Sequence, residues 1–353
     1  MKRLLLFVFL TISPFVPTVH AQFWHALPSI STTAGFQNAQ FSNDEKKVFY
    51  LSGDGKIENI WSVVVADKWG GIIAGKHPPV QITKFTGIGT DARGVVRFFH
   101  LLDSPDILYM RATKDGKDFH IYRIADDGSG TPQDLTPGGA GVTSEIIGAS
   151  YDGRYVYYTS NPTSRDEVDV YRYDTQQFTS EDIFPNDKDY RALAWSRDQN
   201  KLLLELPETG ALSLYNIETT ERDPIALPST APVMEATFDP VSQNLIVMQK
   251  SGDSSVEYTR PLSTGTWKLT QDYGALWMDF SPSGTYEILH TQSAWQVRAR
   301  STGAILPLPE GARPLAIAPH ETMMLYSLPA VSGSQLYLYD IPKKTTTKLA
   351  AVQ

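Results

Sequence analysis

One short tract sets a pattern that returns along the chain: Phe41-Ser42-Asn43-Asp44-Glu45-Lys46-Lys47-Val48-Phe49-Tyr50. It holds an apolar residue, a small or polar residue, a turn, and then a strand-like run beginning six residues after the small one. We call the small residue the anchor of each copy. The anchors are positions 42, 101, 150, 196, 239, 281 and 318, of which 101 belongs to a degenerate copy. Their spacing of 37 to 59 residues predicts a propeller or another repeat array.

Each repeat consists of short alternating apolar runs separated by turn residues. In the third repeat we expect strands over residues 146–149, 155–160, 169–173 and 178–183. No window shows the three-and-four apolar spacing of a long amphipathic helix. Four strands in about 45 residues match a propeller blade. The sequence therefore predicts an all-β fold, a seven-bladed β-propeller of four-stranded antiparallel blades.

Two columns of residues are predicted to pack between neighbouring blades, because sheets stacked face to face bury their apolar positions. The first column lies one residue before each anchor and contains Phe41, His100, Ala149, Trp195, Phe238, Phe280 and Ile317. The second lies three residues before it and contains Ala39, Phe98, Ile147, Leu193, Ala236, Met278 and Leu315. His100 is the one polar member, and we interpret it as a hydrogen-bonded histidine of the degenerate blade.

The first residues resemble a secretory signal peptide. A basic start at Met1-Lys2-Arg3 precedes an apolar run over residues 4–10 and a small-residue exit at Val19-His20-Ala21. We expect cleavage after Ala21, which makes residues 1–21 the leader and residues 22–353 a single propeller domain in the bacterial periplasm or medium. A membrane anchor is the alternative, but the apolar run is shorter than the roughly 20 residues that a span requires, so we expect no span after cleavage.

Composition narrows the class of partner. The chain has no cysteine, which excludes a lipid anchor on cysteine and disulfide bonds. Its net charge of −8 argues against nucleic acid, because binding to phosphates depends on lysine and arginine. We expect a monomer.

Several tracts resemble the repeats of TolB-like propellers and of the propeller domain in prolyl oligopeptidase and dipeptidyl peptidase relatives. They are Phe280-Ser281-Pro282-Ser283-Gly284, and Ile121-Tyr122-Arg123-Ile124-Ala125-Asp126 with Leu135-Thr136. The resemblance covers residues 33 to 349 and implies the propeller fold. The peptidases of that group carry a Gly-x-Ser-x-Gly nucleophile elbow in a separate α/β domain. This sequence contains no such pentapeptide, so we expect the hydrolase domain to be lacking.

Candidate binding residues lie four or five residues before the anchors, where innermost strands bring side chains to one axis. They are Arg97, Glu145, Arg191, Glu235, Trp277 and Arg313, together with Asp279 two residues before its anchor. Mixed charges with a tryptophan favour a recognition surface for a peptide or polar ligand at the channel mouth. The alternative is a ring of salt bridges that only holds the blades together.

The leading hypothesis is a non-catalytic scaffold that binds an envelope protein or peptide and needs no cofactor, metal or catalytic residue. A first alternative is a metal-assisted propeller enzyme of the lyase or lactonase type. Its metal ligands would be His100 and His290 with nearby carboxylates, although no two histidines have the spacing of a local metal-ligand pair. A second alternative is a stand-alone propeller that filters substrates for a separate peptidase.

Overall fold

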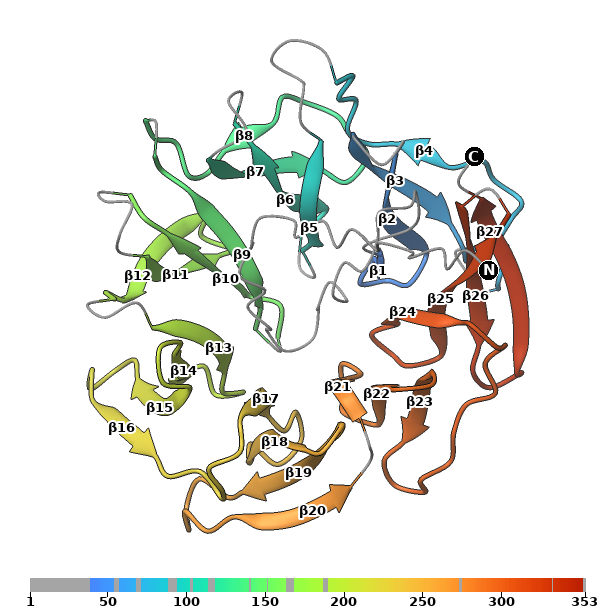
Figure 1. Ribbon diagram of the computed structural model, residues 1–353. Helices are drawn as coiled ribbons and strands as arrows, with labels where there is room; N and C mark the ends of the chain where they lie inside the picture. Colours follow the sequence, from blue (N-terminus) through green and yellow to red (C-terminus); the bar gives the residue numbers. More distant parts are fainter. Residues whose placement is uncertain are drawn as a thin grey trace, which may run out of the picture.

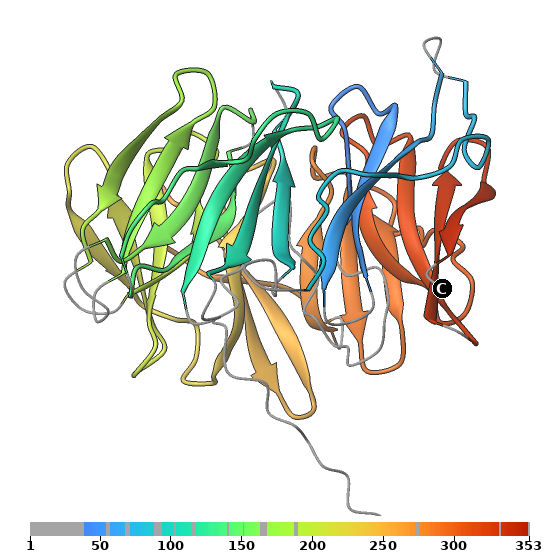
Figure 2. The same cartoon turned by 90° about the horizontal axis from the view of Figure 1, so that it is seen from above.

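Seven antiparallel sheets stand around one axis in the computed structural model, with β1, β5, β9, β13, β17, β21 and β24 innermost (Figure 1). The structure describes residues 39–53, 57–67, 71–87, 94–101, 104–113, 118–139, 141–150, 152–162, 168–186, 190–272, 275–331 and 333–351. The strands run from one face of the ring to the other (Figure 2). No helix long and apolar enough to cross a membrane occurs in these ranges. The predicted leader and its cleavage site lie outside them.

Each blade takes its strands in chain order from the axis outward. Blades 1 to 3 consist of β1 (Ala39–Phe41), β2 (Lys47–Gly53), β3 (Glu58–Val64) and β4 (Val80–Gln81); β5 (Val95–His100), β6 (Asp106–Ala112), β7 (Phe119–Ala125) and β8 (Gln133–Asp134); and β9 (Ser144–Ala149), β10 (Tyr155–Ser160), β11 (Asp169–Asp174) and β12 (Thr179–Phe184). Blades 4 and 5 consist of β13 (Arg191–Trp195), β14 (Lys201–Leu206), β15 (Ala211–Asn216) and β16 (Arg222–Ile225); and β17 (Val233–Phe238), β18 (Leu245–Ser251), β19 (Ser254–Arg260) and β20 (Lys268–Asp272). Blades 6 and 7 consist of β21 (Ala275–Phe280), β22 (Tyr286–Thr291) and β23 (Trp295–Ala299); and β24 (Arg313–Ile317), β25 (Met323–Ala330), β26 (Gly333–Asp340) and β27 (Thr345–Ala351).

The predicted seven-bladed propeller is confirmed, with one correction: blade 6 has three strands. Beyond β23, the chain pairs with it through Ala299 N–H to Ala304 O (2.8 Å) and Leu306 N–H to Val297 O (2.8 Å). Pro307 and Pro309 follow, and proline has no N–H to donate to a sheet. A fourth strand therefore does not extend beyond this point.

The anchor pattern follows from one turn that recurs in every blade. In all seven, the anchor N–H donates to the carbonyl five residues later, at 2.7 to 2.9 Å. At four anchors a serine hydroxyl also accepts the N–H five residues later, at 2.9 to 3.0 Å, namely at Ser42, Ser150, Ser196 and Ser281. Six of the turns contain a residue with φ between 56° and 76°. These demands favour small polar residues and glycine at fixed positions, which makes the repeat visible in the sequence.

The two predicted columns form the inter-blade core. All fourteen residues are at most 8% exposed, so this prediction is confirmed. The innermost strands thus bury apolar side chains on both faces, against the blade before and the blade after. This packing fixes the side chains at the axis within a rigid wall.

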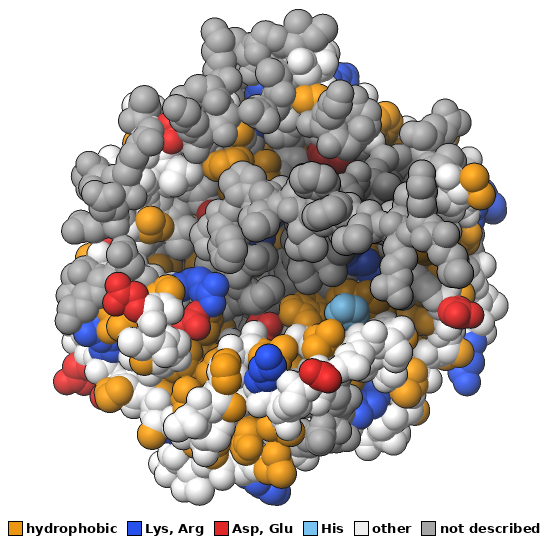
Figure 3. All heavy atoms as spheres, viewed as in Figure 1, with side chains coloured by type: hydrophobic (Ala, Val, Ile, Leu, Met, Phe, Trp, Pro, Cys, Tyr) orange, Lys and Arg blue, Asp and Glu red, His pale blue; other side chains and the backbone are white. Residues whose placement is uncertain are grey.

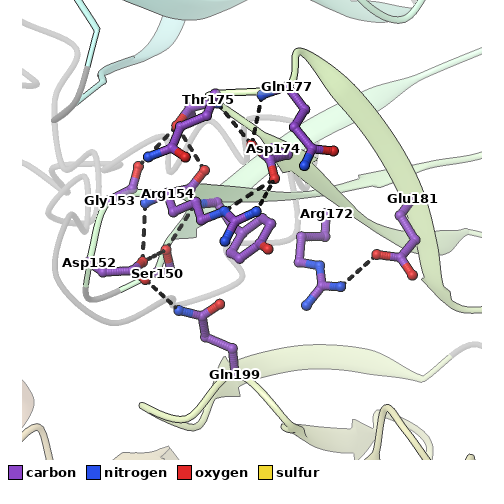
Figure 4. A network of polar contacts seen from close by, with 12 residues as sticks. Ser150, Asp152, Gly153, Arg154, Arg172, Asp174, Thr175, Gln177, Glu181 and Gln199 are labelled. Atoms are coloured by element: carbon purple, nitrogen blue, oxygen red, sulfur yellow. Dashed lines mark hydrogen bonds and ion pairs between the residues drawn. The ribbon is translucent and has the colours of Figure 1, made fainter.

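Polar contacts between anchor turns join neighbouring blades on one face of the ring. Gln199 of blade 4 donates to Asp152 of blade 3 (3.0 Å), beside the pair of Arg154 with Asp174 (3.0 Å; Figure 4). Corresponding contacts connect Arg197 with the Pro240 carbonyl, Arg300 with Asp239, Ser283 N–H with Glu321, and Lys47 with Asp126. These contacts supplement the apolar packing at five of the seven junctions.

Apolar packing and Glu45 connect the first and last blades; Glu45 lies in the first anchor turn and contacts blade 7. Its carboxylate accepts the His320 N–H (2.5 Å) and the Thr322 hydroxyl (2.9 Å), and it lies 3.0 Å from His320 Nδ1. The last blade draws all four strands from the C-terminal part of the chain. The first and last blades are therefore joined by side-chain packing and by Glu45, without a shared sheet among the described strands.

We expect Glu45→Ala to lower the free energy of unfolding by about 2 kcal/mol, because it removes hydrogen bonds to a largely buried carboxylate. Urea denaturation measures the loss. Gln199→Ala is a matched control: Gln199 has the same turn position and a similar φ (63° against 56°), but its inter-blade contact is exposed. Equal losses in the two variants would contradict a special role of Glu45 in closure.

Candidate functional site

Six of the seven predicted channel residues share one structural level despite their uneven spacing from the anchors, whereas Asp279 lies at another level, paired with Ile288. Every innermost strand from blade 2 to blade 7 contains a β-bulge. In blades 2, 5 and 6 the extra residue lies five before the anchor, and in blades 3, 4 and 7 it lies three before it. A bulge shifts the register by one residue. The predicted channel residue therefore lies four residues before the anchor in blades 2, 5 and 6, and five residues before it in blades 3, 4 and 7.

Pairing with the second strand confirms this equivalence. The partners are Met110 for Arg97, Thr159 for Glu145, Glu205 for Arg191, Met248 for Glu235, His290 for Trp277, and Ser327 for Arg313. Each partner lies three residues beyond the one that pairs with the first apolar column. The six side chains thus start from one level of the wall, while the corresponding residue of blade 1 lies outside the described residues.

Arg97 and Glu145 join blades 2 and 3 at this level. Arg97 Nη1 lies 3.4 Å from Glu145 Oε1 and donates to the Ile146 carbonyl at 2.6 Å. Burial raises the pKa of Glu145, and the Arg97 charge opposes that rise. This pair serves the blade contact and still leaves both side chains partly exposed.

Blades 4 to 6 bring together three carboxyl groups, of which Glu205 and Glu235 lie near Arg191 and Asp279 lies near Glu235. Arg191 pairs with Glu205 on the neighbouring strand. Burial raises the pKa of Glu235 well above its usual value, and Asp279 adds to that rise. Burial also raises the pKa of Asp279 to about 8, although its carboxylate accepts the Phe280 N–H at 2.8 Å. At neutral pH Asp279 therefore holds a proton, so it can donate a hydrogen bond as well as accept one.

An aromatic row crosses blade 6 and ends beside Arg313 of blade 7. Trp277, His290 and Trp295 are partners on adjacent strands. The His290 ring stacks on Trp295 at 4.3 Å, Trp277 meets Trp295 edge-on at 5.5 Å, and the Arg313 guanidinium lies 5.9 Å from the Trp295 ring centre. We call these four residues the aromatic row. Figure 3 shows a histidine among hydrophobic side chains, with an arginine or lysine beside it, near the centre of the ring.

The charge of the aromatic row is set by its burial. Burial lowers the pKa of His290, and the nearby Arg313 lowers it further. Burial also lowers the pKa of Arg313. A neutral imidazole, two indoles and a partly desolvated guanidinium can together hold an aromatic or apolar group and an acceptor such as a carboxylate.

The two histidines considered as metal ligands lie in separate clusters. His290 belongs to the aromatic row, whereas His100 stacks on Phe49 of blade 1 at 4.7 Å. Across the part of the chain that the structure describes, no three His, Asp or Glu side chains are grouped to hold a metal ion. The predicted hydrogen-bonded histidine, His100, is 5% exposed, and its Nε2 lies 3.6 Å from Asp126 Oδ2. This contact contributes most to holding the pKa of Asp126 below its usual value.

Glu205 and Trp295 were not predicted as site residues. Both come from second or third strands, whereas the candidates were sought only on innermost strands. Glu205 carries a signal, because it interrupts the apolar run Leu202-Leu203-Leu204 at the position that faces Arg191. Trp295 follows a hairpin turn and carries no comparable signal.

Comparisons with known proteins support the fold. No protein-family model and no curated protein matches the chain. A solved prolyl endopeptidase matches 90% of this chain and 49% of its own length, with a TM-score of 0.62 and 13% identity. The chain thus spans about half the length of that enzyme.

Two shorter solved structures are also similar. TolB from Acinetobacter baumannii has a TM-score of 0.50 and 15% identity, with 91% of this chain and 79% of that chain covered. An oligogalacturonate lyase in complex with manganese has a TM-score of 0.62 and 13% identity, with 88% and 90% covered. The chain therefore shares its propeller fold with TolB, with an enzyme of another kind and with prolyl endopeptidase, as the sequence resemblance implied.

Proposed function

We propose that this chain is a non-catalytic binding propeller that holds a segment of an envelope protein, or a peptide, at the mouth of its channel. The observation that carries the proposal is the aromatic row, in which Trp277 and Arg313 lie on innermost strands and His290 and Trp295 continue from Trp277 across β22 and β23. Tryptophan and arginine supply most of the affinity at many protein interfaces.

The remaining channel residues would give the ligand its orientation. Arg97 and Glu145, on blades 2 and 3, offer opposite charges across the ring from the aromatic row on blades 6 and 7. Glu235 and Asp279, on blades 5 and 6, offer buried hydrogen-bonding groups. A peptide has both an apolar side chain for the indoles and polar groups for the carboxyls. We further propose a periplasmic or extracellular location, which the leader-like residues 1–21 support.

Replacing Trp295 with alanine is expected to weaken capture of the partner at least tenfold, because truncating a central tryptophan typically costs about 2 kcal/mol or more. The measurement is crosslinking and recovery of a defined protein from an envelope extract, followed by titration of that protein against both variants. Trp267→Ala is the control, because Trp267 lies beside the outer strand of blade 5.

Unchanged capture by Trp295→Ala would refute the aromatic row as the binding site, and an equal loss in Trp267→Ala would do the same. Hydrolysis of a chromogenic dipeptide or lactone by the pure protein, abolished by Glu145→Gln or Arg191→Gln, would refute the non-catalytic assignment.

A further inference from the structure

The junction between blades 5 and 6 differs from the others in the side chains that fill it. Its apolar cluster holds six buried residues, Ile246 and Met248 of blade 5 with Ala275, Met278, Phe280 and Leu289 of blade 6. Each of the four junctions from blade 1 to blade 5 has nine or ten such residues among those that the structure describes. Two glutamates take the place of apolar side chains here, and they come from two different strand positions.

Glu257 of β19 is the first of these two glutamates. It pairs with Met248, and Met248 pairs with Glu235 of the innermost strand. The other six blades carry apolar residues at the corresponding position of the third strand, namely Ile60, Ile121, Val170, Leu212, Trp295 and Leu336. Opposite residues of an antiparallel pair lie on the same face of a sheet. Glu257 therefore faces blade 6, as Met248 does.

Glu287 of β22 is the second glutamate, and it faces blade 5. It pairs with Phe280, whose side chain belongs to the same apolar cluster. At this position of the second strand the other six blades carry buried apolar residues, namely Val48, Ile107, Val156, Leu202, Leu245 and Met324. Glu257 and Glu287 are 7% and 4% exposed, and the charge of Glu287 acts on Glu257 across the junction.

Two arginines of blade 6 pair with carboxylates of this junction, and one carboxyl group is left over. Arg298 donates from Nε to Glu287 at 2.6 Å, and Arg300 pairs with Asp239 in the anchor turn of blade 5. The carboxyl group of Glu257 has no hydrogen-bond or ion-pair partner among the described residues. A buried carboxylate without a partner is costly, so the protonation of Glu257 matters for the contact between the two blades.

The charges around Glu257 set the direction in which it responds to pH. Burial raises the pKa of Glu257 to about 7, and the charges of Glu287 and Asp239 add to this rise. The charges of Arg300 and Arg298 oppose it. In an unfolded chain the pKa of a glutamate is about 4.3. The closed junction therefore holds a proton that an opened junction releases, and opening becomes easier as the pH rises from about 4 toward about 7.

From this cluster we propose that the contact between blades 5 and 6 is a pH-sensitive switch, which is closed while Glu257 is protonated and opens locally when Glu257 is ionised. The proton removes the repulsion between Glu257 and the carboxylates of Glu287 and Asp239. Ionisation leaves three carboxylates for two arginines inside a contact with a small apolar core. Glu235, in the same row as Glu257, adds a further acid on this face. The proposal does not rest on binding at the channel.

Hydrogen–deuterium exchange of the full-length chain at about pH 5 and about pH 8 tests the switch, with each rate corrected for the intrinsic pH dependence of amide exchange. Amides of β19 and β22 are expected to lose at least about tenfold in protection between these pH values. Amides of β10 and β14, at the junction between blades 3 and 4, are expected to keep theirs. No loss in β19 and β22 overturns the proposal, and so does an equal loss in all blades, which indicates global unfolding.

Two variants identify the group responsible. Glu257→Gln keeps the shape of the side chain but cannot ionise, so β19 and β22 are expected to be at least about tenfold better protected than in the parent at about pH 8 and equally protected at about pH 5. Glu257→Leu, which introduces the residue that blades 4 and 7 carry, is expected to remove the pH response as well. Glu208→Gln, in an exposed hairpin of blade 4, is the matched control and is expected to behave as the parent does. A pH response that persists in Glu257→Gln overturns the proposal, whether or not Glu257→Leu folds.

Discussion

Replacing Trp195 with alanine is expected to lower the free energy of unfolding by about 3 to 5 kcal/mol. Trp195 lies directly before the anchor of blade 4, is 0% exposed, and stacks on Tyr157 of blade 3 with 4.2 Å between ring centres. Leu202, Leu204 and Tyr215 belong to the same buried cluster. The substitution leaves a large cavity at a junction between two blades, which the rigid sheets on either side cannot fill. Equilibrium urea denaturation followed by circular dichroism measures the loss.

Trp195→Phe is the matched control. Phenylalanine occupies the same position in blades 1, 5 and 6, and its ring keeps most of the contact with Tyr157. The change also removes an indole N–H that is buried without a hydrogen-bond partner among the described residues. We therefore expect a loss below about 1.5 kcal/mol. A Trp195→Ala variant as stable as Trp195→Phe would show that the junction tolerates a cavity, contrary to this account.

The fold was predictable because its repeating element depends on residue type. The anchor turn needs a small polar residue at its start and tolerates glycine where φ is positive, so Ser150 and Gly153 recur in equivalent forms along the chain. The apolar columns add a second periodic signal, since each residue in them is buried between two blades. Even the third repeat, with its strand at Tyr155–Ser160, agrees with the expected element.

The sequence did not define the channel level. The candidates were placed at either four or five residues before the anchor, and the reason is a bulge that lies five residues before the anchor in three blades and three residues before it in the other three. The extra residue is Met234 in blade 5 and Leu193 in blade 4, and neither differs in type from its neighbours in a way that marks a bulge. A one-residue shift reverses the face of a side chain, so the level had to come from strand pairing.

The missing fourth strand of blade 6 could be predicted from the sequence, whereas the contact between Trp295 and Arg313 could not. The missing strand of blade 6 follows from Pro307 and Pro309, which could have been read in the sequence. The contact between Trp295 and Arg313 joins β23, the third strand of blade 6, to β24, the first strand of blade 7. Such a contact depends on the relative placement of sheets, which periodicity does not describe.

The protonation of Asp279 is expected to make the stability of the protein depend on pH. Its pKa is about 8 in the folded protein because it is buried, against about 3.9 in an unfolded chain. The folded state therefore binds more protons than the unfolded state between these values. The contribution of Asp279 to stability is greatest below about pH 4, falls as the pH rises, and levels off above about pH 8. One such group changes the free energy of unfolding by up to about 1.4 kcal/mol for each pH unit in this window.

Asp279→Asn is expected to reduce the pH dependence of the free energy of unfolding by the contribution of one titrating proton. Asparagine keeps a side-chain oxygen to accept the Phe280 N–H, but it cannot ionise. The variant should be more stable than the parent at about pH 8, where the parent holds a buried carboxylate, and the gap should shrink toward about pH 5. Glu235, whose pKa burial also raises, and Glu257, whose pKa is about 7, keep part of the slope in both proteins.

Urea denaturation at several values between about pH 5 and about pH 8 measures the two slopes. Asp223→Asn is the control, because Asp223 is exposed on β16 and the same chemical change there should leave the slope unaltered. Parallel profiles for Asp279→Asn and the parent would mean that Asp279 is already ionised in the folded protein. The channel between blades 5 and 6 would then carry a fixed negative charge at neutral pH, and a ligand with a positive group would be favoured there over a neutral one.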